Sequence, residues 1–413
     1  MKNIHLGKIA LFFLLGFLLI SCGREINSNY DPHFTEDGYR IVTDSAAPID
    51  SLTKVKFYVE VSGSMNGFFR ANQSTEFKRD VWEILTHYKK NSQDVSVLTN
   101  EGKIGQRLKM EDFKEKMDQG RFVSNASTKV PIMLQSILSD VDFSKGEAAV
   151  LISDMKYSPM GKDAKVLMTH YPTDISDTLR GSEKAICLVC ATSVYLDSNG
   201  HSSCDSSPYY YLIIGNEGGV AELRDGISIL LNNNHAFVDN IESGFNYGMI
   251  THGFGIPRNS TQLNSNEPTF IEYAEADETD TCTIYLNVDL SPYRWSLADE
   301  NSLKRAFKAT TLYGSKLMVD IDTIDVKIEG LIRTVTATVR LMVFSMPTES
   351  DVIEWTLELP STDTSFFSPY FGAVEENDCS KSYSIEGFIK GMFYRGFNNQ
   401  TLEPNYILVS KNS

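Results

Sequence analysis

The chain has 413 residues and a formal net charge of −16 at pH 7, from 54 acidic and 38 basic side chains. This excess of negative charge disfavours nucleic acids and anionic lipid surfaces as binding partners. The six cysteines have no regular spacing, so the composition does not indicate a disulfide framework.

The N-terminus has the pattern of an export signal. Lys2 and Lys8 precede an apolar run, residues 9–20, and small or polar residues follow this run directly. This run is much shorter than the roughly 20 residues of a membrane-spanning helix. We therefore expect residues 1–21 to be removed as a signal peptide. The loss of its two lysines would change the formal charge from −16 to −18.

The residues at the predicted cleavage site point to a lipoprotein. Leu19-Ile20-Ser21-Cys22 resembles a lipobox, in which the cysteine thiol accepts diacylglycerol before cleavage. The alternative is a cysteine within an ordinary secretory signal. Acyl chains attached to one residue can hold a protein on a membrane, because each buried CH₂ contributes about 0.8 kcal/mol. Cys22 is therefore the predicted lipid anchor, in the cell envelope and most simply at the outer membrane, with the periplasmic or outer face left open.

Polar, turn-rich residues 22–52 are expected to form a tether. A strand–helix alternation then follows over residues 53–238, which predicts a first domain of α/β class with a doubly wound, mostly parallel sheet. The expected strands are residues 55–61, 94–99, 148–153, 185–194 and 209–214, and the expected helices are residues 74–90, 110–118, 131–141 and 222–231.

Residues 239–413 show a different pattern and predict a second, β-rich domain. Four runs alternate apolar with polar residues, as half-solvated strands of an antiparallel sheet or sandwich do; they are residues 283–290, 323–330, 334–343 and 352–359. Gly330 lies between two of them and is expected to turn a hairpin. A short amphipathic helix is expected near residues 385–393.

The two cysteines of the C-x-x-C motif, Cys187 and Cys190, lie inside an apolar strand. Residues three apart on a strand point to opposite faces, which favours buried thiols over a redox or zinc pair. A disulfide between Cys204 and one of these two is the alternative left open.

Three polar clusters fall where functional residues of such a fold gather. The first strand runs into Glu60, Ser62 and Ser64, residues 124–128 precede a predicted helix, and Asp154 follows the central strand. Ligands of open α/β sheets bind at the carboxyl ends of the strands. Hydroxyl and carboxylate oxygens suit a hard divalent cation, with a coordination position left for an incoming carboxylate.

These clusters resemble the metal-ion-dependent adhesion site of the von Willebrand factor A family. The family has D-x-S-x-S after its first strand, a threonine from a second loop and an aspartate after the central strand. Here Glu60-Val61-Ser62-Gly63-Ser64, Thr128 and Asp154 occur in that order. The resemblance implies that Ser62, Ser64 and Thr128 contact Mg²⁺ or Mn²⁺, with Asp154 and Glu60 acting directly or through water.

The chain departs from the family pattern at three places. Glu60 replaces the first aspartate, the glycines usual before the threonine are missing, and Met155 follows Asp154 where glycine is common. A competing interpretation is that Ser62, Ser64 and Thr128 only cap the following helices.

The sequence contains no G-x-S-x-G, H-E-x-x-H or P-loop motif. The leading hypothesis is therefore a non-enzymatic envelope lipoprotein that binds or scaffolds a protein partner through the A-type domain. One alternative is a metal-dependent envelope hydrolase with Ser62 or Ser64 as nucleophile, although the three loops were expected to offer no His or Lys base. Another is a metal-free structural lipoprotein.

The lipid anchor gives the first testable prediction. Cys22→Ser should abolish lipidation, because the thiol is the acceptor, and should leave the leader uncut or the protein released from the membrane. Detergent phase partitioning and N-terminal mass measurement check this. Correct cleavage and unchanged partitioning of the serine variant would contradict the lipoprotein interpretation.

Overall fold

The computed structural model of the chain describes residues 52–99, 102–122, 124, 129–157, 164–182, 184–245, 273–275, 281–291, 300–358, 364–372, 378–393 and 405–410. The predicted signal peptide with Cys22, the tether up to residue 51, and Thr128 lie outside these ranges. Within them, no helix is both long and apolar enough to cross a bilayer.

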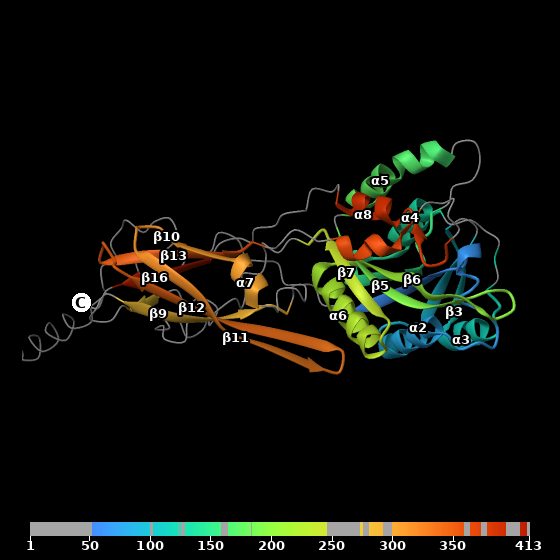
Figure 1. Cartoon of the computed structure of the whole chain (residues 1–413), viewed down its shortest axis with the longest axis horizontal. Coiled ribbons are helices and arrows are strands. Elements are labelled where there is room, and N and C mark those ends of the chain that lie inside the picture. The colour runs from blue at the N-terminus through green and yellow to red at the C-terminus, as the bar shows by residue number, and fades with distance from the viewer. Residues whose placement is uncertain are drawn as a thin grey trace, which may run out of the picture.

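A mixed seven-stranded sheet forms the centre of the larger body (Figure 1). Its strands, in the spatial order β3-β2-β1-β4-β6-β5-β7, are β3 (Lys103–Lys109), β2 (Asp94–Thr99), β1 (Lys54–Glu60), β4 (Glu147–Ser153), β6 (Ser202–Gly215), β5 (Ala185–Leu196) and β7 (Phe237–Ser243). The α/β class is confirmed, but the expected mostly parallel sheet is a mixed one that is parallel only at its centre. The sheet is parallel only at β2-β1-β4, whereas the other neighbouring pairs are antiparallel. Short turns join β2 to β3 and β5 to β6, and strands joined in this way must run antiparallel.

The central strands are apolar on both sides, so each face of the sheet is covered by helices (Figure 1). Phe57 and Val150 point to one face, which packs on α2 (Glu76–His87), α3 (Met110–Asp118) and α6 (Glu217–Asn233). Tyr58 and Leu151 point to the other, which packs on α4 (Val130–Asp140), α5 (Ala164–Arg180) and α8 (Ile385–Phe393).

Several elements of this body were not predicted, among them strand β7, helix α5 and strand β3. The helix α5 contains Pro172, and its first turns expose Val166 and Leu167, so its apolar residues do not follow a single stripe. The edge strand β3 has largely exposed, polar side chains and so lacks the apolar alternation that marks a strand.

The end of the chain returns to the α/β body. Phe367, Phe388 and Met392 are fully buried in the same core as strand β5, and the Ser243 hydroxyl donates a 2.9 Å hydrogen bond to the Met392 carbonyl. The expected boundary at residues 238–239 falls inside β7, and the described residues 364–372 and 378–393 do not join the β-rich body that the sequence assigned them to. Residue pattern predicts that α8 is amphipathic but not which core its apolar face enters.

The β-rich body contains two sheets (Figure 1). One has the order β10-β13-β16-β8, formed by β10 (Phe307–Thr311), β13 (Ser350–Leu357), β16 (Asn405–Ser410) and β8 (Tyr273–Glu275); the other has the order β11-β12-β9, formed by β11 (Lys316–Glu329), β12 (Ile332–Phe344) and β9 (Cys282–Asp289). All strand pairs are antiparallel except β16 with β8. Gly330 has φ +63° and turns the β11–β12 hairpin, as predicted.

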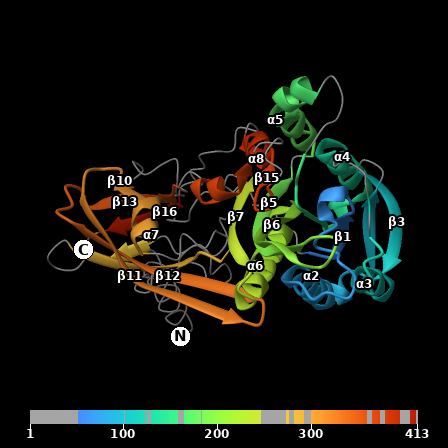
Figure 2. The same cartoon turned by 45° about the vertical axis from the view of Figure 1, so that its right-hand side comes forward.

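The β11–β12 hairpin reaches back to helix α6 of the α/β body (Figure 2). Arg333 of β12 pairs with Asp225 of α6 at 3.2 Å. Arg224, which is fully buried, pairs with Asp225 at 2.8 Å and with Glu242 of β7 at 2.7 Å. Two arginines thus balance two carboxylates in a buried network that spans the two bodies. Removing one member of such a network would leave an uncompensated buried charge.

The contact of α8 with α5 gives a stability prediction. A Cβ at Gly391 would lie 2.7 Å from both the Ile175 Cβ and the Pro172 carbonyl oxygen, whereas a Cβ at Gly181 would meet no atom within 4 Å. Gly391→Val should therefore lower the free energy of unfolding by about 1–3 kcal/mol through overpacking. Gly181→Val serves as the control and should change it far less in urea denaturation. Equal effects of the two substitutions would contradict this close helix contact.

Candidate functional site

Those of the singled-out polar residues that the structure describes lie near the carboxyl ends of strands in the seven-stranded sheet. Strands β1 and β4 are parallel neighbours, with Val59 opposite Ile152, so Glu60 and Ser153 end the two strands side by side. The strand order also reverses here, because β2 lies on one side of β1 and β4 on the other. Such a reversal point is where open α/β sheets bind ligands.

Glu60 is held by the neighbouring strand. It is buried, and the Ser153 hydroxyl donates a hydrogen bond to Glu60 Oε2. The Ser153 oxygen in turn accepts a 2.7 Å hydrogen bond from the Met155 amide. The longer side chain of glutamate thus reaches the end of β4, where one of its oxygens accepts a hydrogen bond.

Asp154 is the centre of the cluster. Its side chain is fully buried; Oδ1 accepts a 3.2 Å hydrogen bond from the Lys156 amide, and the Ser64 hydroxyl also bonds to the carboxylate. Among the described residues, Oδ2 has no hydrogen-bond partner. Burial raises the pKa of Asp154, against the opposing effects of the Lys156 charge and the Ser64 hydroxyl. A buried carboxylate oxygen without a partner is costly, and a bound cation or water would satisfy it.

The two serine hydroxyls lie next to this carboxylate. Ser62 Oγ and Ser64 Oγ are 3.0 Å apart, and Ser64 contacts Asp154. Ser62 precedes a short 3₁₀ helix, η2 (Gly63–Met65), but its side chain makes no capping hydrogen bond. The capping interpretation therefore finds no support at Ser62. Thr128, the ligand expected from the second loop, lies outside the described residues.

Asn66 joins the first loop to the second. Its side-chain amide donates to the Ser124 carbonyl at 2.9 Å, and its Oδ1 accepts from the Ser124 amide at 3.0 Å. Asn66 follows Ser64 by two residues, but the sequence gives no sign of this role, because the partner is backbone 58 residues away.

Met155 adopts a backbone conformation that glycine would favour. Its φ is +53°, in the left-handed region that few non-glycine residues occupy. Methionine in this conformation carries backbone strain that a glycine would not.

Lys156 is the functional candidate that the sequence reasoning missed. It is buried, and its ammonium lies 5.3 Å from the ring centroid of Tyr383 and 5.9 Å from that of Tyr195. Lys156 lies two residues beyond the third polar cluster, and its ring contacts do not make it a base for Ser62 or Ser64. The sequence shows this lysine two residues after Asp154. Its contacts could not be predicted, however, because the two tyrosine rings come from distant parts of the chain.

The cysteines are paired differently from the expected alternatives. Cys187 and Cys190 are buried free thiols in β5, as predicted, but Cys204 forms a disulfide with Cys379, with a Cα–Cα distance of 6.0 Å. Asp378 lies close enough to both sulfurs for a shared metal ion. The sulfurs are joined to each other in the disulfide, however, and offer no thiolate ligand.

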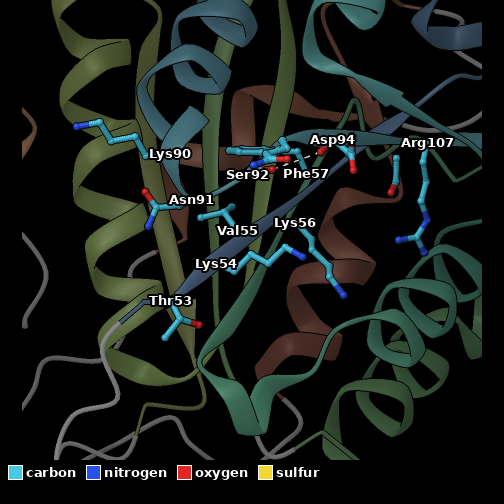
Figure 3. Close-up of a pocket in the computed structure, with 12 residues that line it drawn as sticks. Thr53, Lys54, Val55, Lys56, Phe57, Lys90, Asn91, Ser92, Asp94 and Arg107 are labelled. Atoms are coloured by element: carbon cyan, nitrogen blue, oxygen red, sulfur yellow. Dashed lines mark hydrogen bonds between the residues drawn. The ribbon is translucent and has the colours of Figure 1, made fainter.

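A cavity of about 420 Å³ lies near the amino ends of β1 and β2, at the opposite end of these strands (Figure 3). It is lined by Thr53, Lys54, Val55, Lys56, Phe57, Lys90, Asn91, Ser92, Gln93, Asp94, Ser96 and Arg107. Lys90 points away from Lys54 and Lys56 in this view. Glu147 lies 2.9 Å from the Lys56 ammonium and 3.8 Å from that of Lys54, and Asp140 pairs with Arg107. Two carboxylates thus offset most of the charge of these three cations, which weakens any attraction for an anionic ligand.

Comparisons of the chain with models of protein families, with curated proteins and with solved structures find no match. The chemistry of the cluster is therefore inferred from the geometry of its own residues.

The Asn66 contact gives a prediction about the site's framework. Asn66→Ala removes two hydrogen bonds, each of which contributes about 0.5–1.5 kcal/mol, so the free energy of unfolding should fall by about 1–3 kcal/mol. Asn199→Ala, on the turn between β5 and β6, is the control and should be near neutral. Chemical denaturation measures both. If Asn66→Ala were as stable as the control, the two loops would not be joined by this side chain.

Proposed function

We propose that the protein is a non-enzymatic envelope lipoprotein, anchored through Cys22, that binds a protein partner through a von Willebrand factor A-like domain with a divalent-cation site. The observation that carries the proposal is the fully buried Asp154 carboxylate, whose Oδ2 has no hydrogen-bond partner among the described residues and whose neighbours include the Ser64 hydroxyl.

The donor set fits Mg²⁺ or Mn²⁺. Ser62, Ser64 and Asp154 offer hydroxyl and carboxylate oxygens, which are the ligands these hard cations take. Such a cation, when bound, would keep a coordination position for a carboxylate of the partner. Glu60 fits less well, because the Ser153 hydroxyl engages its Oε2, and we assign Glu60 the role of orienting the end of β4.

Two features support an exported location for this binding function. The leader and Leu19-Ile20-Ser21-Cys22 resemble those of lipoproteins. The disulfide between Cys204 and Cys379 belongs to the kind of bond that forms and persists in oxidising compartments such as the bacterial periplasm and the cell surface.

The alternative of a metal-dependent hydrolase is less favoured by the geometry. A serine nucleophile needs an adjacent base to activate it. In the part of the chain that the structure describes, the Ser62 and Ser64 hydroxyls bond to each other and Ser64 bonds to Asp154, and neither serine bonds to a histidine or lysine. The Lys156 ammonium lies over two tyrosine rings instead.

Cation-dependent stability tests the proposal. Mg²⁺ or Mn²⁺ should stabilise the folded state by about 2.7 kcal/mol when the free ion is a hundredfold above its dissociation constant. The melting temperature should therefore rise with added cation. Asp154→Ala should lose this rise, Glu60→Asp should keep or strengthen it, and Asp177→Ala, at an exposed position on α5, should behave as wild type. Scanning calorimetry with and without chelator measures all four proteins.

Two outcomes would count against the cation site. A shift in Glu60→Asp without one in wild type would show that glutamate has switched the site off, and the metal-free structural lipoprotein would then be preferred. No shift in either protein would leave Ser62, Ser64 and Asp154 as a purely structural cluster.

A further inference from the structure

A segment near the end of the chain lies against the residues that follow β4. We call residues Asp378–Ser384 the strap. It contains β15 (Ser382–Tyr383), which pairs in parallel with β14 (Phe371–Gly372), and it leads directly into α8. The strap contacts Asp154–Tyr157, the part of the candidate site that carries the central carboxylate, across 228 residues of sequence between Asp154 and Ser382.

Three hydrogen bonds join the strap to this part of the site. The Ser382 hydroxyl donates to the Asp154 carbonyl at 3.0 Å, and Ser382 itself is fully buried. The Tyr157 amide donates to the Tyr383 carbonyl at 3.2 Å. The Ser384 hydroxyl donates to the Tyr157 carbonyl at 3.1 Å. The backbone on both sides of Lys156 is therefore held by residues of the strap.

The side chain of Lys156 adds a fourth contact. Its ammonium lies between the rings of Tyr383 and Tyr195, at distances where cation–π attraction acts. The hydroxyl and backbone amide of Ser380 lower the pKa of Asp378 in the strap, and the charges of Lys381 and Lys156 contribute to the same shift. The Lys156 charge thus acts on a carboxylate of the strap as well as on Asp154.

The disulfide fixes the strap to the sheet. Cys379 is bonded to Cys204 of β6, and the Ser207 hydroxyl of β6 donates a 2.6 Å hydrogen bond to the Cys379 carbonyl. Strand β6 is the antiparallel neighbour of β4, the strand that ends just before Asp154. The strap therefore joins the strand beside β4 to the loop that follows β4.

The loop held in this way is strained at Met155, whose φ is +53°. A residue in this region of backbone conformation stays there only where its surroundings fix it. On one side Ser153 Oγ accepts from the Met155 amide, and on the other side the strap holds the Asp154 carbonyl and Tyr157.

We propose that the strap is the positioning element of the candidate cation site. Pinned by the Cys204–Cys379 disulfide, it holds Asp154–Tyr157 so that the Asp154 carboxylate stays beside Ser64. The cation part of this inference rests on the function proposed above; the holding of the loop by the strap does not. The role assigned to Ser382, Tyr383 and the disulfide is to position Asp154, and none of them is a cation ligand.

Backbone hydrogen exchange and Mn²⁺ affinity, measured on the mature chain, test the inference. The variants are the double substitution Cys204→Ser with Cys379→Ser, which leaves no unpaired thiol at the bond, and Ser382→Ala. Ser380→Ala is the matched control, because its hydroxyl bonds to Asp378 within the strap itself. The amides of Lys156 and Tyr157 should exchange about fivefold to tenfold faster in both variants, as the loss of about one hydrogen bond implies.

Amides in the middle of β4 should keep their wild-type exchange rates in these variants, since their partners in β1 and β6 are unchanged. The dissociation constant for Mn²⁺ should rise about tenfold, because the Asp154 carboxylate is no longer held in place. The control should match wild type in both measurements. Ser382→Ala keeps the experiment decisive if the disulfide variant fails to fold.

The other outcomes overturn the inference or separate it from the proposed function. Unchanged exchange at Lys156 and Tyr157 in Ser382→Ala would show that the strap does not hold the loop. Faster exchange with an unaltered Mn²⁺ affinity would overturn the positioning role, and equal loosening of every amide would reduce the strap to general support. If wild type binds no Mn²⁺, the proposed function fails, while the exchange rates still decide whether the strap holds Asp154–Tyr157.

Discussion

The structure depends on one requirement: the central strands of the seven-stranded sheet are apolar on both faces, so both faces must be excluded from water. Residues such as Phe57 and Tyr58, adjacent in sequence and fully buried, point to opposite sides of β1. Helices α2, α3 and α6 cover one side. Helices α4, α5 and α8 cover the other side. In the sequence, α8 comes after most strands of the β-rich body.

The return of the chain couples the two bodies. Because α8 belongs to the α/β core, the described strands of the β-rich sheets lie between β7 and η7 (Ser365–Tyr370) in sequence, except β16, which follows α8. The β11–β12 hairpin adds a second connection through the buried charges of Arg333, Asp225 and Arg224. Ion networks of this kind contribute little net stability, but an arrangement with different pairs would leave a buried charge without a partner. They therefore favour a single docking of hairpin on helix.

The same return brings the strap to the candidate site. A cluster at the carboxyl ends of β1 and β4 follows from the topology, because the strand order reverses there. Its details are particular to this chain: Glu60 reaches Ser153, Met155 occupies a conformation suited to glycine, and Lys156 lies between tyrosines from β5 and from the strap. Glu60 and Met155, two of the positions that depart from the adhesion-site pattern, both bond to Ser153, while residues 125–128 lie outside the described part of the chain. The cluster is thus in direct contact with the strap near the end of the chain.

The sequence by itself determined the local structure. Periodicity located most strands and helices of the α/β body, the hairpin at Gly330 and the amphipathic α8, because these patterns reflect burial within a single element. It also placed Glu60, Ser62, Ser64 and Asp154 at strand ends. Only the tertiary structure decided the direction of β5, β6 and β7, the core that α8 enters, the pairing of Cys204 with Cys379, and the position of Lys156. The physical reason is range: these features join residues that are far apart in sequence, and no local pattern encodes which distant surface an apolar face, a thiol or a buried charge will meet.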